Sequence, residues 1–165
     1  MLHRHLNFAR PGTAHFVTTV TSMRGNWFID DRVCLRLLKS LERARADNRL
    51  KCLGYVLMPD HVHLLLWQDQ EGKCVPDMME SFKKWSSRLF HPEAFGRNPL
   101  WRRGYDDVPL PGSRAMVRRL HYMHNNPVKR GLVQNPEEYR WSSFRPLMDM
   151  EESVVTLVRL DPVIE

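Results

Sequence analysis

Two histidines spaced two residues apart are the first feature of this sequence that could do chemistry. His61 and His63 lie in the apolar run from Met58 to Trp67. If this run is a β-strand, alternate side chains share a face, so both imidazoles leave one side of the sheet while Val62 and Leu64 are buried on the other. Two neutral imidazoles at this spacing can occupy two positions around a divalent metal ion. A working site needs a further ligand and a reactive group.

A tyrosine on a later helix can supply the reactive group. The apolar residues after Ser113 recur at about 100° per residue and form one arc: Met116, Val117, Leu120 and Met123. Tyr122 falls almost opposite this arc, on the face that carries Arg118 and Arg119. Arginine can hold a phosphate while a phenol oxygen attacks phosphorus. If the helix continues, Asn126 lies one turn further, and its side-chain oxygen can be the missing metal ligand.

The end of this helix is marked by Asn126-Pro127. We expect the helix to end or kink there, because the residue before a proline avoids helical geometry. Val128 to Gly131 is then one short turn closed by glycine. A simpler interpretation of the whole segment is an exposed tyrosine on a basic helix.

The composition favours a folded domain with an anionic partner. The chain has 165 residues, 42% of them hydrophobic, and a formal net charge of +6. This charge favours nucleic acid first and an acidic membrane surface second. No apolar run approaches the roughly 18 residues of a spanning helix. Cys34, Cys52 and Cys74 have no CxxC spacing, so we expect reduced thiols in a cytoplasmic protein.

The order of the elements predicts the fold class. The sequence indicates strands at 15–21, 53–58, 61–67 and 100–105, helices from Asp31, Pro76 and Ser113, and irregular segments at 91–99 and 106–112. The strands at 53–58 and 61–67 are expected to form an antiparallel hairpin. This order favours an α+β fold: an antiparallel sheet with helices packed on one face, the ferredoxin-like or split βαβ pattern. We expect one domain over residues 1–148, followed by a tail, 149–165, that is an edge strand or a docked arm.

Two motifs in this chain resemble those of a known family. Pro59-Asp60-His61-Val62-His63 is similar to the His-hydrophobe-His motif of the HUH nucleases. The run from Tyr122 to Val133 resembles the tyrosine-helix signature of single-tyrosine transposases. The segments Asn126-Pro127-Val128-Lys129 and Tyr139-Arg-Trp-Ser-Ser143 are similar to one branch, the REP-associated tyrosine transposases. The resemblance extends over about residues 8–145.

The resemblance implies a HUH-type domain that is a metal-dependent single-stranded DNA endonuclease and strand transferase. His61 and His63 would bind Mg²⁺ or Mn²⁺, with Asn126 as third ligand. Tyr122 would attack phosphorus and leave a 5′-phosphotyrosine link and a free 3′-hydroxyl. The substrate would be single-stranded DNA beside a hairpin, typically an extragenic palindrome, and a homodimer is compatible with the family.

Basic residues near the two motifs are the candidates for DNA contacts. They are Lys83, Lys84, Arg102, Arg103, Arg118, Arg119, Lys129 and Arg130. Asp106 and Asp107 depart from the family pattern, which often has a basic residue before the tyrosine helix. Two acids would repel a phosphate there.

Three other functions compete with this interpretation. A histidine-triad nucleotide hydrolase also uses alternating histidines, but its pattern requires a third histidine near position 65, where Leu65 and Leu66 stand. A catalytically silent module derived from a transposase would bind hairpin DNA without cleaving it. A ferredoxin-like RNA-binding domain would use strand aromatics such as Phe16, Tyr55 and Trp67.

Overall fold

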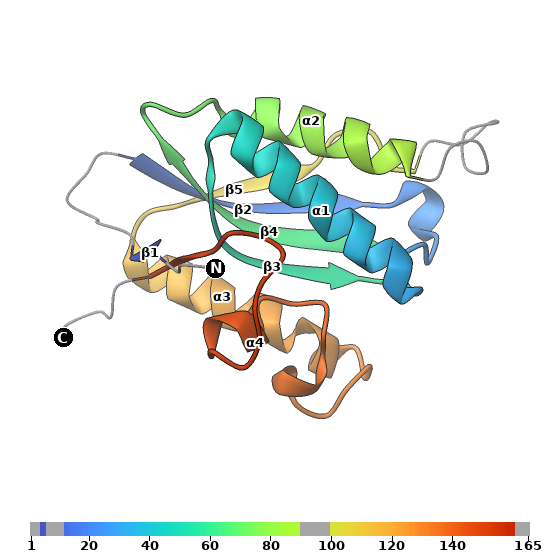
Figure 1. Cartoon of the computed structure of the whole chain (residues 1–165). Coiled ribbons are helices and arrows are strands. Elements are labelled where there is room, and N and C mark those ends of the chain that lie inside the picture. The colour runs from blue at the N-terminus through green and yellow to red at the C-terminus, as the bar shows by residue number, and fades with distance from the viewer. Residues whose placement is uncertain (1–3, 6–11, 90–99, 161–165) are drawn as a thin grey trace.

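A four-stranded antiparallel sheet lies at the centre of the molecule (Figure 1). The computed structural model describes residues 4–5, 12–89 and 100–160. The strands of the sheet are, in spatial order, β3 (Lys51–Met58), β4 (His61–Asp69), β2 (Gly12–Val20) and β5 (Asp106–Leu110). The helices are α1 (Asp31–Asn48), α2 (Val75–Arg88), α3 (Ser113–Lys129) and α4 (Phe144–Leu147). Two 3₁₀ turns cover Ser22–Arg24 and Pro136–Glu138, and β1 (Arg4–His5) pairs in parallel with β6 (Val158–Arg159).

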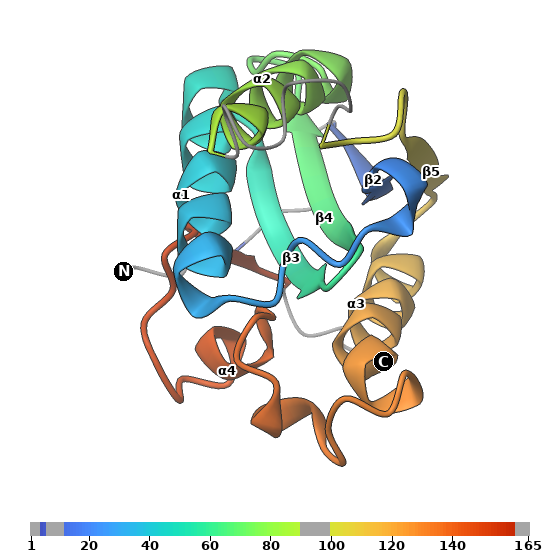
Figure 2. The same ribbon diagram turned by 90° about the vertical axis from the view of Figure 1, so that its right-hand side faces the viewer.

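The two faces of the sheet carry different helices. α1 and α2 lie together over one face, and α3 lies on the opposite face (Figures 1 and 2). Val62, Leu64 and Leu66 of β4 are fully buried in the core under α1 and α2. Leu65 and Trp67 of the same strand belong to a second core beneath α3. The expected α+β fold class is confirmed, with one correction: α1 and α2 share a face, whereas α3 covers the other.

The edge of the sheet next to β2 differs from the prediction. The strand predicted at 100–105 is not formed. In this segment Trp101 makes an isolated bridge to Thr21. The indole of Trp101 donates a hydrogen bond to Ser86 Oγ of α2 at 2.8 Å. The predicted loop instead contains β5, which pairs with β2 along its length. Pro109 is tolerated in β5 because an edge strand has one side without ladder hydrogen bonds. The segment 91–99, predicted to be irregular, lies outside the described residues.

Helix α3 continues through Pro127 and ends at Lys129, so the expected break at Asn126-Pro127 is wrong. The proline costs little here because it lies near the helix end, and Asn126 O still accepts a hydrogen bond from Arg130 N at 3.0 Å. Gly131, with φ of 73°, then closes the segment as expected. The unbroken helix keeps Tyr122 and Asn126 one turn apart.

Segments from the end of the chain cover the outer edge of β3. Leu57 N donates to Trp141 O at 2.8 Å, and Ser143 N donates to Tyr55 O at 2.9 Å. In the tail, Leu157 bridges to Cys52 in parallel. Glu42 of α1 accepts hydrogen bonds from the backbone and hydroxyl of Thr156, both at 2.9 Å. Within the described ranges, no helix has the length and apolar character needed to cross a membrane.

Ser143 connects β3 to the helix that carries the tyrosine. Its buried hydroxyl accepts a hydrogen bond from Tyr55 N at 2.9 Å and lies 2.8 Å from Nε2 of His124 on α3. Burial lowers the pKa of His124 to about 4, so the ring is neutral at pH 7 and its Nε2 shares a hydrogen bond with the Ser143 hydroxyl. One side chain thus links the sheet and α3.

We expect Ser143→Ala to lower the free energy of unfolding by about 1–3 kcal/mol, because it leaves a buried N–H and a buried imidazole nitrogen without partners. Urea denaturation measures this loss. The matched control is Ser142→Ala, which removes one hydrogen bond, from Phe144 N at 3.2 Å. Equal losses in the two variants would contradict the linking role of Ser143.

Candidate functional site

His61 and His63 lie side by side on the face of β4 that α3 covers. Their ring centroids are 4.7 Å apart with an interplanar angle of 77°. Their exposed fractions are 3% and 6%, so both imidazoles are buried. The predicted alternation of this strand is confirmed, because Val62 and Leu64 are buried on the other face.

The Asp60 carboxylate orients His61. Nδ1 of His61 lies 2.6 Å from Asp60 Oδ1, so the ring donates its Nδ1 hydrogen and leaves the Nε2 lone pair available. Burial lowers the pKa of His61, although the neighbouring carboxylate opposes this shift. Arg24 approaches the other Asp60 oxygen at 3.3 Å, which ties the turn before β4 to the loop after β2. A carboxylate behind a histidine is a common way to fix a metal ligand.

His63 is oriented by Thr18 and meets Asn126. Asn126 Nδ2 donates to Nε2 of His63 at 3.3 Å, so this nitrogen carries a lone pair. The hydrogen of the neutral ring is therefore on Nδ1, which donates to Thr18 Oγ1 at 2.8 Å. Burial, followed by nearby cationic groups, lowers the pKa of His63 to about 3. The ring is neutral at pH 7, as a metal ligand must be.

These residues fit a divalent metal ion. Asn126 is 6% exposed, and its Oδ1 is a buried oxygen without a hydrogen-bond partner among the described residues. A buried polar atom without a partner costs free energy, and a cation would remove that cost. Two imidazole nitrogens and one amide oxygen are a partial ligand set for Mg²⁺ or Mn²⁺. Across the described ranges, no group of three or more His, Cys, Asp or Glu side chains could hold a metal by itself.

Tyr122 lies beside the histidine pair, outside the core. Its ring centroid is 6.0 Å from that of His63 and 6.0 Å from that of Phe16, and the side chain is 43% exposed. Phe16 stacks on His63 with centroids 5.0 Å apart. Arg119 lies 5.9 Å from the tyrosine ring and 4.9 Å from that of Phe16. The phenol is therefore accessible to a large substrate and held near both a cation and the imidazoles.

A cavity of about 480 Å³ joins these groups. His61, His63, Tyr122 and Asn126 all line it. Its basic lining residues are Arg24, Arg102, Lys129 and Arg130. All four residues predicted to carry the chemistry thus come together within one chain, in a cavity of cationic character.

The other predicted DNA contacts lie outside this cavity. Arg103 and Arg118 are exposed and do not line it. Lys83 and Lys84 are on α2, across the sheet. Lys83 donates to the backbone oxygens of Arg102 and Gly104, so it supports the segment that carries Arg102.

The two acids before the tyrosine helix have different surroundings. Asp107 lies 2.9 Å from Nδ1 of His15, and it does not line the cavity. Asp106 does line the cavity, so the expected repulsion of a phosphate would come from this carboxylate alone.

Sequence reasoning missed the groups that hold the histidines in place. Thr18 and Phe16 belong to β2, whose register sets Thr18 opposite His63. The sequence signal for Thr18 was its place in a β-branched strand, but the pairing register is needed to find its partner. For Arg24, the sequence predicted only a turn. Asp60 was noted only as part of the histidine motif, without a role of its own.

Comparisons with known proteins found a family model and relatives that are similar to this chain. Residues 11–126 match the model of a family described as IS200-like transposases. The REP-associated tyrosine transposase of Escherichia coli K12 is 20% identical over 137 residues, which cover 83% of this chain and 79% of that protein. A Haemophilus influenzae relative, given the same name provisionally, is 22% identical over 143 residues, covering 81% of this chain and 80% of its own.

A solved structure described as a REP-associated tyrosine transposase bound to a REP hairpin has a TM-score of 0.69 and 17% identity. The match covers 90% of this chain and 86% of that one. The resemblance read from the two motifs is confirmed by these comparisons.

We expect Asp60→Asn to weaken Mn²⁺ binding by about 10–100-fold, because His61 loses the carboxylate that fixes its tautomer and raises its basicity. Calorimetric titration with Mn²⁺ measures the change. Asp106→Asn removes the carboxylate that lines the cavity without touching either histidine, and should have a much smaller effect. The reverse order would mean that Asp106 holds the metal and that Asp60 does not support it.

Proposed function

We propose, from the premise that this chain belongs to the IS200-like transposase family, that it is a metal-dependent endonuclease and strand transferase. It acts on single-stranded DNA beside palindromic hairpins and forms a 5′-phosphotyrosine intermediate. One observation carries the proposal. Tyr122 and Asn126 lie one turn apart on α3, and that turn lies against His63, so nucleophile and ligand set share one cavity.

The proposed metal ligands are His61 and His63 through Nε2 and Asn126 through Oδ1. A Mg²⁺ or Mn²⁺ ion held by these residues would supply Lewis-acid polarisation of the scissile phosphate and stabilise charge on its oxygens. Asp60 and Thr18 fix the two tautomers in which Nε2 carries the lone pair; that of His63 accepts the Asn126 Nδ2 hydrogen until a metal ion takes its place. This fixed arrangement reduces the reorganisation needed when the substrate arrives.

Tyr122 is the proposed nucleophile. Its oxygen forms a bond to phosphorus while the bond from phosphorus to the 3′-oxygen of the preceding nucleotide breaks. The phenol loses one proton and the departing oxygen takes one up, so a 3′-hydroxyl and a 5′-phosphotyrosine result. Attack of a DNA 3′-hydroxyl on this link reverses the step and joins the strand. Arg119 and Lys129, both with their cationic groups 5.9 Å from the tyrosine ring, attract the phosphate toward the phenol.

The proposed substrate agrees with the charge of the cavity. Arg102, Lys129 and Arg130 line it and can contact successive phosphates. The E. coli relative is named for REP sequences, and the similar solved structure is described as bound to a REP hairpin. We therefore place hairpin DNA as the partner of this chain. Because Tyr122 lines the cavity of its own chain, the proposed reaction does not require a tyrosine from a second copy.

We expect the wild-type protein, mixed with labelled single-stranded hairpin DNA from the host's repeats and Mn²⁺, to give an adduct that survives denaturation. EDTA should abolish it, and Tyr122→Phe should lower its yield by at least about 10³-fold, because no other nucleophile replaces the phenol. The measurement is denaturing gel electrophoresis of the labelled DNA.

The matched control is Tyr105→Phe, which removes the hydroxyl of a half-buried tyrosine that does not line the cavity. This variant should form the adduct as the wild type does. Retention of the hairpin without any adduct, across several repeat hairpins, would show the catalytic proposal to be wrong and favour a hairpin-binding module.

A further inference from the structure

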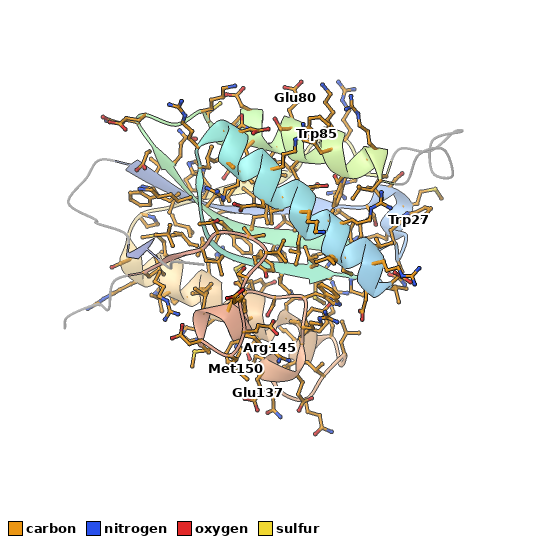
Figure 3. The ribbon with its side chains drawn as sticks, viewed as in Figure 1. Trp27, Glu80, Trp85, Glu137, Arg145 and Met150 are labelled. Atoms are coloured by element: carbon orange, nitrogen blue, oxygen red, sulfur yellow. The ribbon has the colours of Figure 1, made fainter. Side chains whose placement is uncertain are left out.

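A second cationic concavity lies on the opposite side of the sheet, between α1 and α2. This α1/α2 groove has a volume of about 440 Å³. Its lining includes Arg36, Lys39, Arg43, Trp85 and Arg88, and none of the described residues contributes a carboxylate to it. Trp85 belongs to α2 and lies where this helix runs beside α1 (Figure 3). The catalytic residues face away from this groove, because α3 covers the other face of the sheet.

The cations of the groove are largely without counter-charges. Arg43 reaches Asp47 at 3.8 Å, an exposed pair of small energetic value. Arg36, Lys39 and Arg88 have no ion pair within the part of the chain that the structure describes. Like charges held close together raise the free energy of the folded chain, and a polyanion that binds there lowers it.

Trp85 organises two of these cations. The guanidinium carbon of Arg43 lies 3.3 Å from the centre of the Trp85 ring, and that of Arg88 lies 4.7 Å from it. Stacking on an aromatic ring pre-organises a guanidinium group and leaves its N–H donors directed outward. On an ordinary solvated helix face, the two arginine side chains would not contact a common residue. Here both guanidinium groups contact the indole of Trp85.

The chemistry of the groove selects its ligand. Guanidinium and ammonium groups recognise phosphate oxygens without reading the sequence of bases. Single-stranded binding sites present open aromatic rings on which unpaired bases stack. In this groove the indole is already covered by guanidinium groups, so it does not offer such a platform. The groove therefore suits the backbone of a duplex, whose bases are already paired.

We propose that the α1/α2 groove is a second DNA site that binds the phosphate backbone of duplex DNA without base specificity. Arg36, Lys39 and Arg43 recur at i, i+3 and i+7 and so span about 10 Å along α1. Arg88 faces them from α2. The choice of DNA as the polyanion rests on the proposed function; the charge and shape of the groove do not depend on it.

The test measures duplex binding while the catalytic cavity is occupied. Protein saturated with a short single strand is titrated with a labelled blunt duplex of arbitrary sequence, by fluorescence anisotropy at several KCl concentrations. Arg88→Glu should weaken duplex binding about 5–10-fold and reduce the slope of log K against log[KCl] by about 1. Arg36→Glu should do the same, and Arg88→Lys should retain most of the affinity.

Lys73→Glu is the matched control, because it makes the same change in net charge at an exposed residue outside both concavities. It should change duplex affinity less than about twofold. Equal weakening by Arg88→Glu and Lys73→Glu would overturn the proposal and leave only a general charge effect. Binding of polyglutamate at this groove in preference to the duplex would also overturn it, in favour of an acidic protein partner.

Measuring the covalent adduct on the same variants separates the two proposals. If Arg88→Glu forms the adduct normally but binds duplex like the wild type, the groove proposal fails and the proposed function stands. If no protein forms an adduct but Arg88→Glu still loses duplex affinity selectively, the proposed function fails and the groove proposal stands. Thermal unfolding by circular dichroism confirms that each variant is folded.

Discussion

The antiparallel pairing of β2 with β4 is the constraint on which the site depends. Its register sets Thr18 opposite His63 and Val20 opposite His61. Because side chains alternate along a strand, a slip of one residue would turn both histidines into the core beneath α1 and α2 and move Leu64 and Leu66 to the face that α3 covers. The apolar pattern therefore fixes the register, and the register delivers the imidazoles to the face where α3 lies. The core residues of β4 position the proposed metal ligands as directly as Asp60 and Thr18 do.

Burial then gives the two histidines a single chemical character. Removing water disfavours their charged forms, and the pKa values of both His61 and His63 are lowered. Asp60 and Thr18 occupy the two Nδ1 positions, so each ring has one defined tautomer. Such rings suit ligation better than proton transfer. Tyr122 has the opposite environment: it is exposed, and cations lie near it. The division fits a reaction in which the imidazoles hold a cation and the phenol meets the substrate.

Sequence reasoning predicted the parts of this site that depend on local pattern. Alternation placed His61 and His63 on one face, and helical spacing placed Tyr122 outside the apolar arc.

Sequence reasoning failed where tertiary contacts determine the local structure. The dipeptide Asn126-Pro127 signals a break, yet packing of α3 on the sheet keeps the helix intact to Lys129. Asp106 to Leu110 contains a proline and two acids, yet it pairs with β2 as an edge strand. Thr18 carries no local signal of its role, because only the register reveals its partner. The side of the sheet that α3 covers was likewise set by packing.

The two concavities lie on opposite sides of the sheet and differ in the charges that line them. In the cavity that holds Tyr122, Asp106 lies among the cations, and the Asn126 oxygen, without a hydrogen-bond partner among the described residues, also favours a cation. In the proposed reaction, phosphate binding there is therefore coupled to the proposed metal ion, which would offset negative groups on protein and substrate alike. The described lining of the α1/α2 groove has no carboxylate, so its attraction for a polyanion needs no metal ion and weakens directly with added salt. Cleavage and backbone attachment should consequently respond to different ions, and a chain that holds a duplex through the groove retains it whether or not the catalytic cavity contains metal.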